Sequence, residues 1–305
     1  MKKIQIGTST IEASQIALGC MRMAGLSLND ASSVVNTARE SEINFFDHAD
    51  IYGSGESEIT FGKVLKSNNI SRTDIFIQSK CGIREGFYDF SKEHIMSSVE
   101  GSLSRLGTDY LDVLALHRPD ALMEPDEVAE AFYQLHKQGK VRNFGVSNFS
   151  PTSLQLLQQT LTQKLNVNQL QFGLKHAGMV ASNMNVNMEN DEGINRDGAV
   201  LDHMRLNNIT IQAWSPYQYG YFEGVFINHP EFKKLNDALE RLANEYGVTP
   251  TGIATAWINR HPANIQTIIG TMNPERIKEV AQASDVVLTR QQWYELYQAS
   301  GFKLL

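Results

Sequence analysis

The chain has 305 residues, of which 42% are hydrophobic, and its 27 basic and 34 acidic residues give a net charge of −7. One parallel α/β barrel can use this length, and the hydrophobic fraction is ordinary for a globular domain. The acidic surplus argues against a protein that binds the phosphate backbone of nucleic acids. It favours a soluble cytosolic enzyme, and a charge that only aids solubility fits equally well.

The first residues and the cysteines indicate where the chain works. Residues 1–5 lack the apolar region of a signal peptide, and no apolar run approaches the roughly 20 residues that span a bilayer. We therefore expect a cytoplasmic protein without a membrane segment. Cys20 and Cys81 both follow apolar runs, so we expect two buried or half-buried thiols rather than a disulfide framework. Because Cys81 adjoins Lys80, a redox role is the minor alternative.

Apolar runs alternate with amphipathic segments along the whole chain. Residues 2–13 predict a hairpin that turns at residues 7–9. The eight runs that predict buried strands are residues 16–20, 43–46, 75–80, 110–117, 141–146, 165–170, 208–213 and 265–269. The segments whose apolar spacing predicts helices include residues 31–38, 92–106, 126–138 and 289–300. Eight strand–helix units predict a (β/α)8 TIM barrel with an N-terminal hairpin and long connecting loops, one domain over residues 1–305.

Two segments fall outside this repeat. Residues 176–197 contain five asparagines and no clear helical face, so they predict an inserted loop after the sixth strand. The last helix, residues 289–300, follows the eight units and is free to cover one face of the barrel.

Residues 53–58, Gly-Ser-Gly-Glu-Ser-Glu, superficially match a dinucleotide-binding loop. The third glycine of Gly-x-Gly-x-x-Gly is missing, because Glu58 holds its place. Glu56 and Glu58 would also repel a pyrophosphate at the start of the following helix. We therefore interpret both as acids that stabilise the helix dipole.

Titratable residues follow three of the predicted strands. Asp47 ends the run 43–46, Tyr52 follows it within a Gly-containing loop, and Lys80 and His117 end the next two runs. In a barrel, catalytic side chains gather at the carboxyl ends of the strands. We therefore expect an acid, a phenol, an ammonium and an imidazole in one pocket, a set that suits proton transfer to or from oxygen.

These four residues predict a reaction. An ammonium at the end of a buried strand needs a partner, and Asp47 on the neighbouring strand can supply it. Lys80 would favour the phenolate of Tyr52 and lower its pKa from about 10. Tyr52 would give its proton to a carbonyl oxygen as a hydride reaches the carbon, while His117 orients the substrate. The prediction is carbonyl reduction, which needs a hydride donor.

Four stretches make the chain resemble the aldo-keto reductase family over nearly its whole length: residues 45–53, 79–82, 116–120 and 145–149. It is most similar to a bacterial oxidoreductase branch that carries Gly-Cys-Met-Arg at the first strand. The resemblance implies a (β/α)8 barrel, NADPH extended over the carboxyl ends of the strands, with NADH possible, and a small-molecule carbonyl substrate. The catalytic tetrad that it implies is Asp47, Tyr52, Lys80 and His117.

The resemblance also implies how the nicotinamide is bound. Ser147, Asn148 and Gln169 would hydrogen-bond the carboxamide. Trp214 occupies the position where an aromatic ring faces the nicotinamide.

The same resemblance implies the binding of the adenosine end. Residues 270–276 would hold the 2′-phosphate, and Asn273 with Pro274 independently predicts a helix start that carries Arg276, which is an anion site. A surface arginine is the alternative. Many family members carry lysine where this chain has Gly270, so the strength of the preference for NADPH stays open. The remaining implied cofactor contacts are Gly19, Met21, Ser215, Pro216, Gly270, Thr271 and Glu279.

Loops after the strands predict a partly aromatic substrate pocket lined by Phe87, Tyr88, Arg118 and Tyr217, with Arg118 facing an anionic or polar substrate. The sequence gives neither the substrate nor the oligomeric state.

Two other functions remain open. A metal-dependent barrel hydrolase would take ligands from Asp47, His48, Asp50 and His117, but no His-x-His pair or cysteine cluster supports it, and we predict no metal. An NADPH-binding regulatory protein with little turnover is the second, because some family members act as channel partners.

Overall fold

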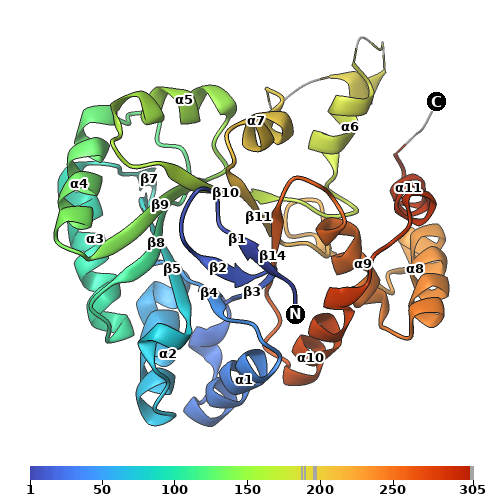
Figure 1. Cartoon of the computed structure of the whole chain (residues 1–305), viewed down its shortest axis with the longest axis horizontal. Coiled ribbons are helices and arrows are strands. Elements are labelled where there is room, and N and C mark those ends of the chain that lie inside the picture. Colours follow the sequence, from blue (N-terminus) through green and yellow to red (C-terminus); the bar gives the residue numbers. More distant parts are fainter. Residues whose placement is uncertain (187, 189, 195–197, 303–305) are drawn as a thin grey trace.

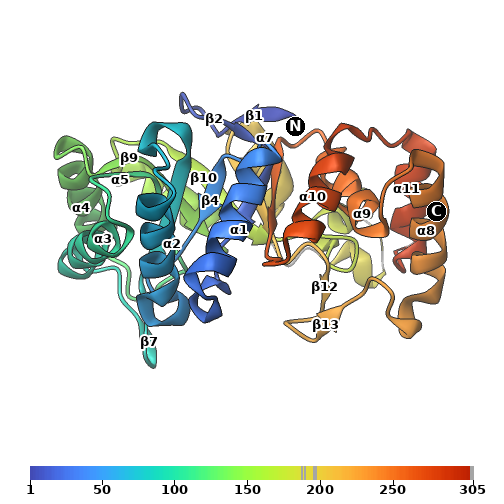
Figure 2. The ribbon, with the colours of Figure 1, turned by 90° about the horizontal axis from the view of Figure 1, so that it is seen from below.

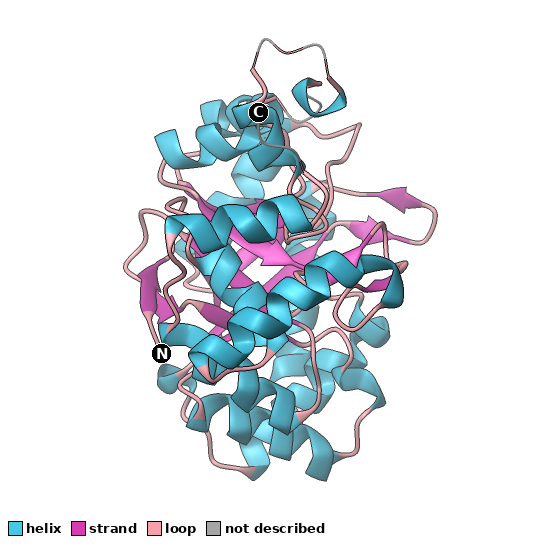
Figure 3. Cartoon of the chain, turned by 90° about the vertical axis from the view of Figure 1, so that its right-hand side faces the viewer, coloured by secondary structure: helices cyan, strands magenta, loops and turns pink. Residues whose placement is uncertain are grey.

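The computed structural model describes residues 1–186, 188, 190–194 and 198–302. Within these residues, eight parallel strands close into a barrel in the order β10-β11-β14-β3-β4-β5-β8-β9, and helices surround the strands (Figures 1 and 3). The barrel strands are β3 (Ile16–Gly19), β4 (Phe45–Asp47), β5 (Phe76–Cys81), β8 (Leu111–Leu116), β9 (Val141–Ser147), β10 (Leu165–Gln171), β11 (Thr210–Trp214) and β14 (Ile265–Ile269). Each coincides with one of the eight predicted runs, so the predicted (β/α)8 barrel is confirmed.

The helices begin where the sequence supplies caps. Ser27, Ser91 and Thr249 each accept a hydrogen bond from the backbone N–H three residues on, which satisfies an otherwise unpaired donor of the first turn. The helices are α1 (Leu28–Glu40), α2 (Glu56–Ser67), α3 (Lys92–Leu106), α4 (Pro125–Lys137), α5 (Pro151–Thr160), α6 (Gly178–Met184), α7 (Val200–Leu206), α8 (Lys233–Tyr246), α9 (Pro250–Asn259), α10 (Pro274–Gln282) and α11 (Arg290–Ala299).

An N-terminal hairpin closes one end of the barrel. Strands β1 (Lys3–Gln5) and β2 (Glu12–Ser14) pair antiparallel, as predicted. Apolar side chains of the hairpin, among them Ile6 and Ile11, pack in one buried cluster with Phe45 and Val167 of the barrel. The short strands β7 (Phe87–Tyr88), β12 (Gln218–Tyr219) and β13 (Gly224–Val225) project from the opposite end (Figure 2). The amino ends of the strands are therefore plugged, and the carboxyl ends are left for a site.

The predicted inserted loop is partly helical. Within residues 176–197, helix α6 buries Met179, Val180 and Ala181, so the prediction of an irregular loop is wrong for this part. Met179, Val180 and Ala181 are adjacent in the sequence, so they lack the three- to four-residue spacing of an amphipathic helix. All three are buried because other segments contact this helix. Positions 187, 189 and 195–197 of the predicted loop lie outside the described residues.

The last helix packs at the side of the molecule. Helix α11 lies beside α8 (Figure 1), and its Trp293 stacks on Trp257 of α9 with ring centroids 4.8 Å apart. Each indole N–H donates to the other residue's backbone oxygen at 3.0 Å. These contacts hold α11 against other helices, so it does not cover an end of the barrel. No helix of the described ranges is long and apolar enough to cross a bilayer.

Candidate active site

A cavity of about 1420 Å³ lies at the carboxyl ends of the barrel strands, and we call it the rim cavity. The predicted site residues on its wall are Gly19, Met21, Asp47, Tyr52, Tyr88, His117, Arg118, Ser147, Asn148, Gln169, Trp214, Ser215, Pro216, Tyr217, Gly270, Thr271, Arg276 and Glu279. Lys80 is fully buried and contacts Tyr52 of this wall. Phe87 lines no described cavity, and its ring lies 5.0 Å from the Arg84 guanidinium. Its predicted contact with substrate is therefore not supported, because neighbouring residues of a strand face opposite sides.

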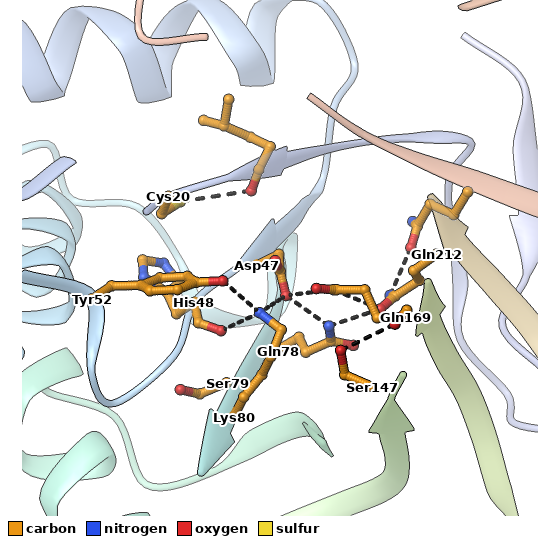
Figure 4. A network of polar contacts seen from close by, with 12 residues as sticks. Cys20, Asp47, His48, Tyr52, Gln78, Ser79, Lys80, Ser147, Gln169 and Gln212 are labelled. Carbon is orange, nitrogen blue, oxygen red and sulfur yellow. Dashed lines mark hydrogen bonds and ion pairs between the residues drawn. The ribbon is translucent and has the colours of Figure 1, made fainter. Parts of the chain in front are cut away.

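The structure brings the four predicted catalytic residues together, and Figure 4 shows three of them, Asp47, Tyr52 and Lys80. Asp47 and Lys80 lie at the ends of the adjacent strands β4 and β5. The Lys80 Nζ lies 2.7 Å from Asp47 Oδ1 and donates to Tyr52 Oη at 3.2 Å. His117 follows β8, and its ring stands nearly perpendicular to that of Tyr52, with centroids 5.8 Å apart. Contacts thus run from the Asp47 carboxylate through the Lys80 ammonium to the Tyr52 phenol, and the His117 imidazole lies beside the phenol.

A tight turn carries Tyr52 over the barrel. Gly53 has φ of 58°, and a Cβ added there would lie 2.3 Å from the Cβ of Ala24. Only glycine tolerates both the left-handed conformation and this close approach. Ser54 also has a positive φ, of 55°, which is uncommon for a residue with a side chain. The turn that leads the chain from Tyr52 into α2 therefore requires glycine at position 53.

The Asp47–Lys80 pair is buried and hydrogen-bonded. Asp47 Oδ1 also accepts from Gln78 Nε2 at 2.7 Å and from Gln169 Nε2 at 3.2 Å, and Lys80 Nζ donates to the backbone oxygen of His48 at 2.7 Å. Burial alone would lower the pKa of Lys80, but Asp47 and Tyr52 outweigh it and raise that pKa. The ammonium therefore keeps its charge.

Burial raises the pKa of Tyr52, and Lys80 opposes this effect without reversing it. The predicted net lowering is therefore wrong, although the contribution of Lys80 has the predicted sign. The prediction left out the cost of placing a phenolate in a buried site. The consequence suits a proton donor, because Tyr52 keeps its proton at neutral pH.

His117 is held neutral. Burial lowers its pKa well below the ordinary histidine value, and the charges of Lys80 and Arg118 act in the same direction. A neutral imidazole carries one N–H donor. His117 can therefore hydrogen-bond an oxygen in the rim cavity without competing with Tyr52 as an acid.

The residues expected at the nicotinamide form a hydrogen-bonded string at the ends of β9, β10 and β11. Trp214 Nε1 donates to Asn148 Oδ1 at 3.3 Å, and Asn148 Nδ2 donates to Ser147 Oγ at 2.7 Å. Ser147 Oγ in turn donates to the backbone oxygen of Gln169 at 3.0 Å. These bonds fix polar side chains and one aromatic ring on the same wall, an arrangement that fits a flat ring bearing a carboxamide.

The residues expected at the adenosine end surround the start of α10. The Asn273 side chain accepts from the backbone N–H of Glu275 at 2.9 Å, so the predicted N-cap is present. Arg276 is exposed in the first turn and forms no ion pair within the described ranges. Arg22, which sequence reasoning missed, also lines the cavity, and its Nη1 donates to the backbone oxygen of Gly270 at 2.9 Å. Its place in Gly-Cys-Met-Arg is the signal that pointed to it.

Glu58 has a role in addition to the one predicted. Its side chain is fully buried, accepts from Arg105 Nε at 2.8 Å and accepts from Ser79 Oγ at 2.6 Å. The ion pair joins α2 to α3, while the serine lies next to Lys80 on β5. Glu58 lies in the first turn of α2, where the predicted interaction with the helix dipole is possible, but the prediction missed the ion pair, because a partner 47 residues away is invisible in local sequence.

A second cavity of about 920 Å³ adjoins the first, and we call it the side cavity. The two share Arg118, Asn148, Trp214 and Tyr221 on their walls. Beyond this shared wall, residues of α6, Lys175 and the C-terminal residues 300–302 line the side cavity. Sequence analysis did not predict it, because segments distant in sequence form it together.

The groups proposed for a metal site do not converge. The His48 ring packs edge-on against Phe61, with centroids 4.6 Å apart, and burial lowers its pKa to about 3. Across the described part of the chain, no three His, Cys, Asp or Glu side chains are placed to hold a metal ion. Cys20 and Cys81 are free and buried as predicted, and burial raises the pKa of both thiols.

Comparisons with known proteins agree with this geometry. The model of the Aldo/keto reductase family matches residues 3–300. Oxidoreductase YdhF of Escherichia coli (strain K12) is 34% identical over 311 residues that cover 98% of each chain. A 6-dehydroglucose reductase of Agrobacterium fabrum is 35% identical over 311 residues that cover 97% of each chain.

A solved structure shares the fold. The crystal structure of a thermostable aldo-keto reductase, Tm1743, in complex with the inhibitor epalrestat matches with a TM-score of 0.80 and 24% identity, over 98% of this chain and 100% of that one. The family match over nearly the whole length decides the assignment: the chain belongs to the aldo-keto reductase family, whose oxidoreductases reduce carbonyl groups with a nicotinamide cofactor.

Proposed function

We propose that residues 1–305 form one reductase domain that converts an aldehyde or ketone to an alcohol with NADPH, and that Tyr52 donates the proton. The observation that carries the proposal is the position of Lys80 Nζ, 2.7 Å from Asp47 Oδ1 and 3.2 Å from Tyr52 Oη, at the rim cavity. Burial keeps the Tyr52 proton in place by raising its pKa. The adjacent ammonium stabilises the phenolate that remains after the transfer.

The residues on the cavity wall fit NADPH. Ser147, Asn148 and Gln169 offer polar groups for the carboxamide, and Trp214 offers a ring face for the nicotinamide. The exposed Arg276 at the capped start of α10 fits the 2′-phosphate, because helix N-termini and arginines both bind phosphate. When bound, NADPH supplies the hydride to the carbonyl carbon.

The protein groups act on the carbonyl oxygen. Tyr52 Oη gives its proton to this oxygen, and the Lys80 ammonium then compensates the negative charge on Oη. Asp47 holds Lys80 in place through the buried ion pair. The neutral His117 donates a hydrogen bond to the same oxygen and orients the substrate. General acid catalysis of this kind contributes about 10²–10⁴-fold to the rate.

For the substrate, we propose a carbonyl compound with an anionic or polar group. Arg118 lines both cavities, and its guanidinium carbon lies 5.6 Å from the centre of the Trp214 ring. Within the described ranges, no carboxylate lies within ion-pair distance of it. An unpaired guanidinium beside the reaction centre favours a carboxylate on the substrate. Sugar aldehydes are the second class, since one relative is named a 6-dehydroglucose reductase.

The test is turnover of the purified protein with NADPH across aldehydes, ketones and dicarbonyls, with and without a carboxylate. Wild type should consume NADPH, and Tyr52→Phe should lose about 10²–10⁴-fold in kcat while its NADPH Kd stays unchanged. A Phe variant that keeps most of the rate would refute the role of Tyr52. Tight NADPH binding without turnover on any substrate would favour the regulatory alternative. Stoichiometric metal in the protein would favour the hydrolase.

A further inference from the structure

Four glutamines form a polar layer inside the barrel, in place of the apolar side chains that usually fill it. They are Gln78 on β5, Gln169 on β10, Gln212 on β11 and Gln266 on β14, and none is more than 4% exposed. The strand register places Gln169 opposite Gln212 and Gln212 opposite Gln266. Gln78 lies opposite Asp47 in the same way. The layer therefore ends at the proposed active site, and Figure 4 shows three of its members around Asp47.

One end of the layer is anchored on a backbone carbonyl. Gln266 Nε2 donates to the backbone oxygen of Ser14 at 2.8 Å, in the strand that closes the bottom of the barrel. Gln212 Nε2 donates to Gln266 Oε1 at 2.9 Å. A carbonyl oxygen only accepts, so Gln266 must present its NH₂ to Ser14 and its oxygen to Gln212. Because the Gln266 oxygen faces Gln212, the Gln212 amide must present its NH₂ to Gln266 and its oxygen to the opposite side.

The other end of the layer converges on the carboxylate of the ion pair. Gln212 Oε1 accepts from Gln78 Nε2 at 2.8 Å and from Gln169 Nε2 at 3.2 Å. The same two NH₂ groups donate to Asp47 Oδ1, at 2.7 Å and 3.2 Å. Carboxylates accept only, so Asp47 requires Gln78 and Gln169 to present their NH₂ groups. The Ser14 carbonyl imposes the same orientations from the other end, through Gln266 and Gln212. The hydrogen-bond network thereby fixes every amide orientation, which is the way such orientations are assigned.

Asp47 Oδ1 thus receives three N–H donors, from Lys80, Gln78 and Gln169. A flipped amide would instead point its oxygen at the carboxylate, and the two negative ends would repel each other. Without Gln212, the layer loses the acceptor that opposes such a flip. The position of the carboxylate, and with it the distance from Lys80 to Tyr52, then loses its support.

We propose that Gln212 and Gln266 are positioning residues for the proton donor: they orient Gln78 and Gln169, which hold Asp47 where it aligns Lys80 with Tyr52. Neither Gln212 nor Gln266 lines the rim cavity, so neither is expected to touch substrate or cofactor. The inference rests on the proposed function for its kinetic consequences only.

The matched variants are Gln212→Met and Gln266→Met, with Thr267→Val as the control. Thr267 adjoins Gln266 on β14, is also fully buried, and its Oγ1 donates to Asn259 Oδ1 at 2.8 Å. The control therefore removes a partly buried hydrogen bond of the same strand outside the glutamine layer. Gln266→Met lies farther from the site, and it keeps the proposal testable if Gln212→Met does not fold.

We expect both glutamine variants to lose roughly ten- to a hundredfold in kcat, since displacing a catalytic group by about 1 Å costs up to 10²-fold. KM and the NADPH Kd should stay near wild type, and Thr267→Val should keep its kcat. Added to Lys80→Met, either glutamine variant should cause little further loss, because both act through the same ammonium. A folded variant with wild-type kcat, a loss matched by Thr267→Val, or full additivity with Lys80→Met would overturn the proposal.

A second readout does not need turnover. The ionisation of Tyr52 can be followed by ultraviolet difference spectra between each protein and its Tyr52→Phe counterpart. Lys80, Asp47, Cys20 and His117 are the titratable groups around Tyr52, and Lys80 favours the phenolate. Misplacing Lys80 should raise the midpoint in the glutamine variants but not in Thr267→Val. An unchanged midpoint would overturn the inference. A raised midpoint in a protein without reductase activity would instead count only against the proposed function.

Discussion

The Asp47 carboxylate and the Lys80 ammonium form a 2.7 Å ion pair inside the barrel, where Lys80 is fully buried and Asp47 is 2% exposed. A buried pair of this kind adds little net stability, but removing one partner typically costs about 3–5 kcal/mol, because the other charge is left unpaired. Its value to this protein lies in the fixed ammonium beside Tyr52.

Lys80→Met should therefore lower the reductase rate severely and also destabilise the fold by about 3–5 kcal/mol. Lys80 opposes the rise in the pKa of Tyr52, so its loss should move the alkaline limb of the reverse, alcohol-oxidising reaction to higher pH. The measurements are pH–rate profiles and urea unfolding. An alkaline limb that stays in place in a folded variant would show that Lys80 does not tune Tyr52.

Arg276 should carry most of the preference for NADPH over NADH. Hydrogen bonds to charged groups are worth about 1.5–3 kcal/mol, so Arg276→Ala should weaken NADPH about ten- to a hundredfold. NADH lacks the 2′-phosphate, so its Kd should change little. Lys278→Ala is the control on the same helix, because Lys278 is paired with Glu275 at 3.1 Å. Equal weakening of both cofactors by Arg276→Ala would mean that Arg276 supports the helix or the adenine pocket.

Arg22 should make a smaller contribution at the same end of the cavity. Its guanidinium is exposed and already donates to the backbone oxygen of Gly270. An exposed charge contact is worth about 0.2–1 kcal/mol, so Arg22→Ala should weaken NADPH by up to about fivefold. Titration of the cofactor at low and high salt checks this, because the difference should shrink as salt screens the charge. A loss that is independent of salt would assign Arg22 a packing role.

Arg118 should select substrates that carry a carboxylate. We expect Arg118→Met to raise KM for 4-carboxybenzaldehyde about ten- to a hundredfold, the size of one or two charged hydrogen bonds. KM for benzaldehyde should change little, because benzaldehyde has no carboxylate for the Arg118 guanidinium to bind. Parallel changes for both aldehydes would place the substrate carboxylate away from Arg118.

His48 should make the fold sensitive to acid. Its pKa is lowered to about 3 in the folded chain, and neither ring nitrogen has a hydrogen-bond partner among the described residues. A histidine in the unfolded chain has a pKa near 6.5. Above that pH His48 leaves the free energy of unfolding unchanged, and that free energy decreases as the pH drops from about 6.5 towards about 3. The loss at pH 5 should be about 2 kcal/mol. Urea unfolding of His48→Leu at pH 7.5 and pH 5 should show a smaller decrease than wild type, and an equal decrease would contradict the assignment.

Local sequence was enough to find the barrel and the four residues of the proposed proton relay. Strand β8 is apolar at every position except Asp112 and is buried throughout, as expected of a strand covered on both faces. Since the carboxyl ends of parallel strands meet at one rim, a polar residue at a strand end is placed by topology alone. The order of the strands along the chain is therefore sufficient to group Asp47, Lys80 and His117.

Local sequence could not find contacts that depend on partners far along the chain. Glu58 has the local pattern of a dipole-stabilising acid, but its partner Arg105 lies on another helix. Arg22 reaches Gly270 only through the barrel closure that brings β3 next to β14.

Periodicity and the order of the strands were enough to predict the fold and the chemical groups at the rim, and the resemblance of four short stretches was enough to predict the family. How those groups behave depends on contacts that only the folded chain makes. The pKa of Tyr52 rises because burial outweighs the Lys80 charge, and no sequence pattern contains that balance. The amides of Gln78 and Gln169 face Asp47 because a chain of donors runs from Ser14 across the barrel interior. Such directions follow from three-dimensional neighbours, since an amide can point either way until its partners are in place.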